Sequence, residues 1–136
     1  PPHTRQEEHE GRERVRETLD FVGLSGFEND LARNLSYGAQ KRLEIARALC
    51  TSPELILLDE PAAGLTTQEL AGLIEMIRKI RERGITVLLV EHRMDVVMSI
   101  SDRIMVLSFG QKIAEGTPDE VRANPAVIEA YLGKEG

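Results

Sequence analysis

The 136-residue sequence has a single cysteine, no long apolar run and an excess of acidic over basic residues. The lone Cys50 excludes an internal disulfide and fits a reducing compartment. No apolar run approaches the about 20 residues that cross a bilayer, and no signal peptide opens the chain. Any work at a membrane is therefore expected from outside the bilayer. Because the first residue is not Met, we expect a fragment or a processed chain.

Positive charge is also in short supply. The 17 basic and 23 acidic residues give a formal charge of −6, which argues against a nucleic-acid surface, because such surfaces are normally basic. Hydrophobic residues make up 41% and charged residues 29%, the balance of a soluble globular protein with room for one core.

The N-terminal third reads as helical. Residues 1–12 are polar, and we expect a loose entry segment there. Val15, Leu19 and Val22 then share one helical face, and Gly23 is a plausible stop. A second helix is predicted from Ser36 to about Cys50.

The rest of the chain alternates strands with helices. Leu55–Leu58 and Ile85–Val90 read as strands buried on both faces, as in a parallel sheet. A third strand is predicted over 103–107, with a hairpin to 111–114. Capping boxes predict helices from Thr66 to about Arg83 and from Thr117, a short helix is expected over 95–100, and Asn124-Pro125 opens a last one. This order predicts an α/β fold with a mainly parallel sheet flanked by helices and a partial helical subdomain at the N-terminus.

Two acidic residues follow the first strand in the segment LILLDE. Ligands of open α/β sheets bind beyond the carboxyl ends of the strands. Of Asp59 and Glu60, one can hold a hard metal ion such as Mg²⁺, directly or through water, while the other faces a substrate. Many strands end in an acidic pair that has no such role, so the pattern alone leaves both interpretations open.

The segment LSYGAQ precedes the second helix. Ser36 can cap that helix, Gly38 permits close backbone approach, and the free N–H groups of a helix start can bind an anion. An ordinary capped helix is the alternative.

Read together, LSYGAQ, LILLDEP, AAGL and VLLVEH resemble, in order and spacing, the nucleotide-binding domain of ABC transporters, a P-loop NTPase fold. The resemblance runs from about Val15 onward. Leu35–Gln40 resembles the signature, Leu55–Glu60 resembles Walker B, 63–66 corresponds to the D-loop and His92 to the switch histidine. Tyr37, DEPAAGL, EH-x-MDVVM and the ending GTPDEVRANPAVIEAYLG resemble the branched-chain amino acid importers.

The resemblance implies roles for these residues. Asp59 would support Mg²⁺, Glu60 would polarise the attacking water, and His92 would contact the γ-phosphate of ATP. The signature and D-loop would act in trans, on ATP bound by a second subunit packed head to tail; they comprise Ser36, Tyr37, Gly38, Ala39 and Gln40, and Ala63, Gly64, Leu65 and Thr66. By position alone, His92 is a surface histidine after a strand. His3 and His9 are assigned no role.

Two positions depart from the family pattern. Ala39 stands at the fifth signature position, where the family has Gln, although Gln40 follows at once. The change removes a side-chain amide but no helix-terminus N–H, so we expect a modest effect. Thr66 replaces the D-loop aspartate and makes a good N-cap.

No G-x-x-x-x-G-K-[ST] occurs in the sequence, so neither the backbone loop nor the Lys that holds β- and γ-phosphates is present. The family's Q-loop and adenine-stacking strands are also missing. We therefore divide the chain into a loose segment (1–12), a partial helical subdomain (13–52) and the C-terminal part of the ATPase core (53–136). In the family, the phosphate-loop strand separates the strands that here are 85–90 and 103–107. We expect these two to pair with each other, or a second copy to fill the gap.

The resemblance thus implies an ATP-hydrolysing subunit of an ABC importer, inactive as this chain alone, that works with a second ATP-binding subunit and transmembrane permease subunits at the cytoplasmic face of the plasma membrane. No nucleic-acid partner is expected. Two alternatives stay open: a non-catalytic assembly module, and an ABC-type ATPase that is not coupled to transport.

Overall fold

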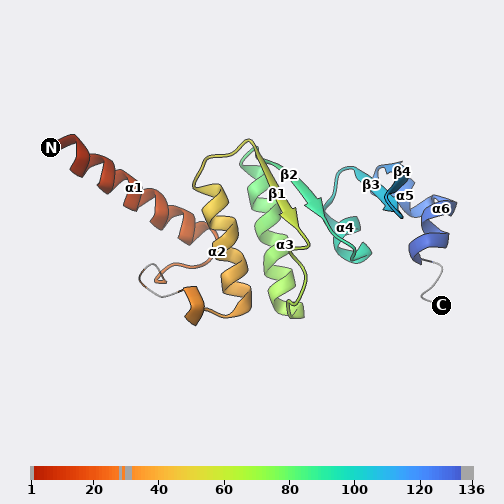
Figure 1. Cartoon of the computed structure of the whole chain (residues 1–136), viewed down its shortest axis with the longest axis horizontal. Coiled ribbons are helices and arrows are strands. Elements are labelled where there is room, and N and C mark those ends of the chain that lie inside the picture. Colours follow the sequence, from red (N-terminus) through yellow and green to blue (C-terminus); the bar gives the residue numbers. More distant parts are fainter. Residues whose placement is uncertain (1, 28, 30–31, 133–136) are drawn as a thin grey trace. The chain divides into compact units, whose positions relative to one another are not determined.

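The computed structural model describes residues 2–27, 29 and 32–132, and the chain divides into two compact units, Pro1–Val90 and Glu91–Gly136. Each unit contains one two-stranded sheet (Figure 1). The two units meet between Val90 and Glu91. The boundary predicted between the helical subdomain (13–52) and the ATPase core (53–136) is a different one and stays a prediction.

The first helix, α1 (Pro2–Phe21), begins well before the position expected from the apolar pattern. The expectation of a loose segment over 1–12 was therefore wrong. The residues there are mostly Glu, Arg, Gln and His, and the long unbranched ones among them are good helix formers. Pairs one turn apart support the helix: Gln6 donates to Glu10 over 3.4 Å, and His9 lies 3.2 Å from Glu13. The helix propensity of these residues thus extends α1 toward the N-terminus, although their described side chains are exposed.

The second helix, α2 (Tyr37–Leu49), begins and ends close to where it was predicted. A single 3-10 turn, η1 (Ala32–Asn34), precedes it. Leu19 and Val22 of the α1 region and Ile45 and Leu49 of α2 are buried. Gly23 ends α1 with φ +80, as expected for a glycine stop.

Strands β1 (Leu55–Asp59) and β2 (Thr86–Val90) form a parallel pair in which Leu57 lies opposite Leu88 and Asp59 opposite Val90. Helix α3 (Thr67–Glu82) connects them and buries one apolar face that includes Leu73, Ile77 and Ile80. Figure 1 shows α2 and α3 running beside this pair. Gly84, with φ +86, follows α3 as predicted.

The expectation that β1 and β2 are buried on both faces was wrong. Ile56 and Leu58 are buried and line one hollow with Ile45 and Ala48 of α2 and Leu73 of α3. The opposite face is exposed, and its four large apolar side chains are 50–60% accessible: Leu55, Leu57, Leu88 and Val90. The residue types resemble those of a doubly covered sheet, but among the described residues of the first unit, helices pack on one side of the pair.

The second unit holds α4 (Met94–Ile100), an antiparallel hairpin of β3 (Ile104–Ser108) and β4 (Gln111–Gly116), and a helical end. That end comprises α5 (Pro118–Ala123), α6 (Pro125–Val127) and the π-helical turn η2 (Ile128–Leu132). The hairpin and the helices share a small core of Ile104, Val106, Ala114, Val121 and Val127. The predicted hairpin and helix starts are confirmed, and Thr117 and Asn124 are the N-caps.

Each unit has its own strand pair: β1 with β2 in the first unit and β3 with β4 in the second. The short turn at Phe109-Gly110 joins β3 to β4. The expected pairing of the 85–90 and 103–107 strands, which lie in different units, stays a prediction. The filling of the gap by a second copy stays a prediction.

Among the described residues, no helix is both long enough and apolar enough to span a bilayer.

Candidate functional site

The signature segment, Leu35–Gln40, forms the start of α2. Ser36 is the N-cap, and its hydroxyl oxygen accepts a hydrogen bond from the Ala39 N–H over 3.2 Å. The Gln40 side-chain amide reaches back to the Leu35 carbonyl over 3.2 Å. Gly38 is buried, whereas Tyr37 is about half exposed. The segment is therefore a well-capped turn whose glycine lies against other parts of the chain.

The D-loop segment, 63–66, leads into α3 through a reciprocal capping box. The Glu69 N–H donates to the Thr66 hydroxyl, and the Thr66 N–H donates to Glu69 Oε1, both over 3.1 Å. Gly64 has φ +75, a conformation that favours glycine. The capping box predicted at Thr66 is thus confirmed, and Glu69 is its acidic member.

The signature and D-loop segments lie against each other. A Cβ added at Gly64 would come within 2.9 Å of the Tyr37 ring, and one added at Gly38 would overlap Glu69 Oε2 and lie 2.8 Å from its Cδ. Ser36, Gly38, Leu65 and Glu69 also line one hollow of about 280 Å³. Two glycines therefore permit this contact between segments that are far apart in the sequence.

Glu69 is the polar centre of this contact. Hydrogen bonds from the backbone N–H and the hydroxyl of Thr66 hold the pKa of the Glu69 carboxyl below its ordinary value. A hydrogen bond from the Gly38 N–H and the charge of Arg42 act in the same direction. The carboxylate thus satisfies donors at the starts of two helices, α2 and α3.

Asp59 and Glu60 lie at the carboxyl end of β1, where they were predicted, and both are exposed. Asp59 is the last residue of the strand and, with Lys41 and Glu44 of α2, lines a second hollow of about 250 Å³. Glu60 turns away from the strand with φ +47, and its N–H donates to the Val90 carbonyl over 2.7 Å. This hydrogen bond fixes the turn between the two carboxylates to the end of β2.

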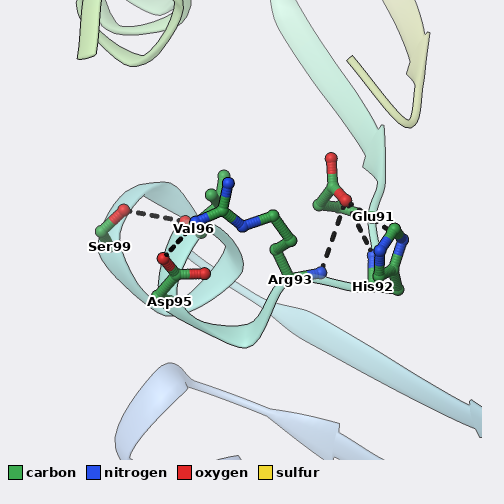
Figure 2. Close-up of polar contacts among 6 residues, drawn as sticks. All are labelled: Glu91, His92, Arg93, Asp95, Val96 and Ser99. Carbon is green, nitrogen blue, oxygen red and sulfur yellow. Dashed lines mark hydrogen bonds and ion pairs between the residues drawn. The ribbon is translucent and has the colours of Figure 1, made fainter. Parts of the chain in front are cut away.

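In the second unit, His92 follows β2 and precedes α4, and its side chain is 67% exposed. Figure 2 shows the Glu91 carboxylate beside it. Glu91 Oε1 accepts from the backbone N–H of His92 over 3.0 Å and from that of Arg93 over 3.4 Å, and it lies 3.5 Å from His92 Nδ1. Arg93 in turn contacts Asp95 at 2.9 Å. Glu91 therefore shapes the turn that presents His92.

Two family models match the sequence: the ABC transporter model over residues 1–63, and the branched-chain amino acid ATP-binding cassette transporter model over residues 111–136. The high-affinity branched-chain amino acid transport ATP-binding protein BraF of Pseudomonas aeruginosa is 49% identical over 98% of this chain. LivG of Escherichia coli, described in the same terms, is 48% identical over the same share. The structure of an ATP-binding cassette of an ABC transporter in its ADP conformation superposes with a TM-score of 0.82 at 36% identity, over 92% of this chain and 51% of that one.

The chain is thus similar to ATP-binding proteins of ABC transporters over nearly its whole length. It covers 52% of BraF and of LivG, and thus spans about half the length of these relatives. The solved cassette confirms the predicted fold class, an α/β P-loop NTPase domain present in part.

Against this family pattern, the contacts of three residues were missed from the sequence. Glu69 was recognised only as a helix cap, although it also reaches Gly38. Tyr37 was noted as a subfamily feature, although its ring also packs on Gly64. Glu91 was noted only as part of a motif, although an acidic residue directly before a candidate phosphate-sensing histidine is a signal for an orienting partner.

Proposed function

We propose that this chain is part of an ATP-hydrolysing subunit of an ABC importer for branched-chain amino acids, acting with a second ATP-binding subunit and with permease subunits at the cytoplasmic face of the membrane. The observation that carries the proposal is the 49% identity to BraF over 98% of this chain. These relatives are about twice as long as this chain. We therefore assign the complete activity to a protein of their length.

In this proposal, the residues at the end of β1 serve the subunit's own nucleotide. Asp59 would hold Mg²⁺, directly or through water. Among the described residues, no group of three His, Cys, Asp or Glu side chains converges to hold a metal. Mg²⁺ commonly binds through one carboxylate together with waters and nucleotide phosphates, so Asp59 alone could supply the protein's ligand. Glu60, exposed beside it, would accept the proton of the attacking water.

The other segments would complete the reaction centre. His92 would donate a hydrogen bond to the γ-phosphate, with Glu91 orienting the turn that carries it. Ser36 and Gly38 of the signature segment, together with the D-loop, would act on the nucleotide of the partner subunit. Because hydrolysis of a phosphoanhydride depends mainly on positioning and on charge stabilisation, a centre divided between subunits is chemically reasonable.

The test is the substitution Glu60→Gln in a version of the protein extended by a segment with a G-x-x-x-x-G-K-[ST] loop. ATP turnover should fall on the order of 100-fold or more while ATP binding persists, because Gln keeps the shape but cannot accept the proton. Glu54→Gln, a matched change of an exposed carboxylate just before β1, should leave turnover unchanged.

The 136-residue chain alone should not hydrolyse ATP, since it lacks the loop that holds the phosphates. Mg²⁺-dependent turnover by this chain that disappears in Glu60→Gln would refute that expectation. Equal turnover in the extended Glu60→Gln and Glu54→Gln proteins would refute the assigned role of Glu60.

A further inference from the structure

Two segments that the proposed function places at a neighbouring subunit's nucleotide are joined within this chain by one side chain. Glu69 Oε1 accepts from the Thr66 N–H, at the end of the D-loop segment. Its other oxygen, Oε2, lies directly against Gly38 of the signature segment, where a Cβ of residue 38 would be. The Gly38 N–H also helps to lower the pKa of this carboxyl. A single carboxylate therefore spans the two segments, one oxygen to each.

A second, independent contact ties the same segments together. The Tyr37 ring packs on Gly64, which has no Cβ to obstruct it. Arg42, one turn along α2 from Gly38, adds its positive charge beside Glu69 and donates to the Val22 carbonyl over 3.3 Å. The lack of a Cβ at Gly72 leaves room for the Arg42 guanidinium on α3. Polar contacts of Glu69 and the apolar contact of Tyr37 thus both join the signature segment to the D-loop segment.

We propose that Glu69 is a positioning residue that fixes the signature segment and the D-loop segment to each other, so that the two move as one body. Its importance for catalysis rests on the proposed function, in which both segments meet the partner's nucleotide. A fixed relation between them means that a displacement of either segment at the subunit interface is transmitted to the other. This role goes beyond helix capping, because a cap requires only the Thr66 contact.

Glu69→Gln separates the two roles. Gln serves in a capping box as Glu does, so the start of α3 should persist. Its side chain offers only one oxygen, however, and the amide nitrogen that replaces the other cannot accept from the Gly38 N–H. Glu75→Gln is the matched control, because it makes the same change on the same helix at an exposed residue whose nearest charged partner is Arg78, at 3.7 Å.

Amide hydrogen exchange, followed by NMR on the 136-residue chain, provides the measurement. In Glu69→Gln, exchange at Gly38 should accelerate about tenfold or more, and exchange at Gly64 and Leu65 should accelerate with it, since the lost hydrogen bond has a charged acceptor. The amides at the start of α3 and the global unfolding transition should change little. Glu75→Gln should match the wild-type chain throughout.

A second measurement uses no substitution. In the wild-type chain, the Gly38 amide resonance should shift with pH as the Glu69 carboxyl titrates, with a midpoint below the ordinary 4.5. The proposal is overturned if Gly38 exchange is unchanged in Glu69→Gln, if exchange rises only within 66–70, or if the Gly38 resonance does not follow the carboxyl. The exchange experiment tests a contact within the chain, whereas the Glu60→Gln experiment tests ATP hydrolysis. Either result can therefore be negative while the other is positive.

Discussion

At the scale of single residues, the loop after β1 is notable for its backbone. Glu60 has φ +47 without being a glycine, and Gly64 has φ +75 four residues later. A non-glycine residue in this region stores strain of about 1–3 kcal/mol, which the surroundings must offset. Here the hydrogen bond from the Glu60 N–H to the Val90 carbonyl helps to hold the turn. The backbone between Asp59 and Glu60 is therefore held in one conformation. This suits the proposed division of roles, in which Asp59 holds Mg²⁺ and Glu60 accepts a proton.

Gly64→Ala tests the contact between the D-loop and the signature segment. The substitution adds strain at positive φ and places a Cβ 2.9 Å from the Tyr37 ring. Gly84→Ala is the control, because Gly84 has φ +86 but no atom within 4 Å of an added Cβ. We expect Gly84→Ala to lower the free energy of unfolding by about 1 kcal/mol and Gly64→Ala to lower it by roughly twice as much. Urea unfolding measures both, and equal losses would contradict the packing of Tyr37 on Gly64.

At the scale of helices and strands, the sequence correctly predicted the features that depend on neighbouring residues, such as helix caps. Ser36, Thr66 and Thr117 cap helices where the sequence placed them, because a hydroxyl before a helical pattern acts on N–H groups only a few residues away. The contact between Glu69 and Gly38 could not be predicted in this way, because it joins distant segments. The start of α1 was missed because residues 2–12 lack an apolar pattern, and only their helix propensity indicates a helix there.

The cap of α3 can be measured by comparing Thr66→Ala with Thr67→Ala. Thr66→Ala removes the acceptor for the Glu69 N–H, and we expect the free energy of unfolding to fall by about 0.5–2 kcal/mol. Thr67 is exposed at the first helical position, where alanine is a good helix former, so Thr67→Ala should be neutral or slightly stabilising. Thermal or urea unfolding followed by circular dichroism decides the matter. No difference between the variants would show that the cap contributes nothing to stability.

At the scale of the whole molecule, the sequence predicted the strand pair within each unit but not which face of the β1–β2 sheet would be exposed. The apolar runs of β1 and β2 indicated a parallel sheet correctly, since their parallel pairing is observed. They could not indicate that Leu55 and Leu57 would stay exposed, because a residue's hydrophobicity does not reveal whether a covering layer is present in the chain. The pairing of β3 with β4 was predictable from the short turn between them.

The exposed sheet face leads to the last prediction, self-association of the 136-residue chain. Leu57 and Leu88 are register partners on that face, 60% and 53% exposed. Within the described residues the β1–β2 sheet has no third strand, and an unpaired strand edge favours pairing with another chain. We expect sedimentation to show association that strengthens with protein concentration. Leu57→Lys should weaken it by about tenfold or more, because burying one leucine contributes about 1.5–3 kcal/mol. Gln68→Lys adds the same charge at an exposed position on α3 and should leave association unchanged. A chain that stays monomeric, or one in which both lysine variants associate like the wild type, would contradict a role for this face.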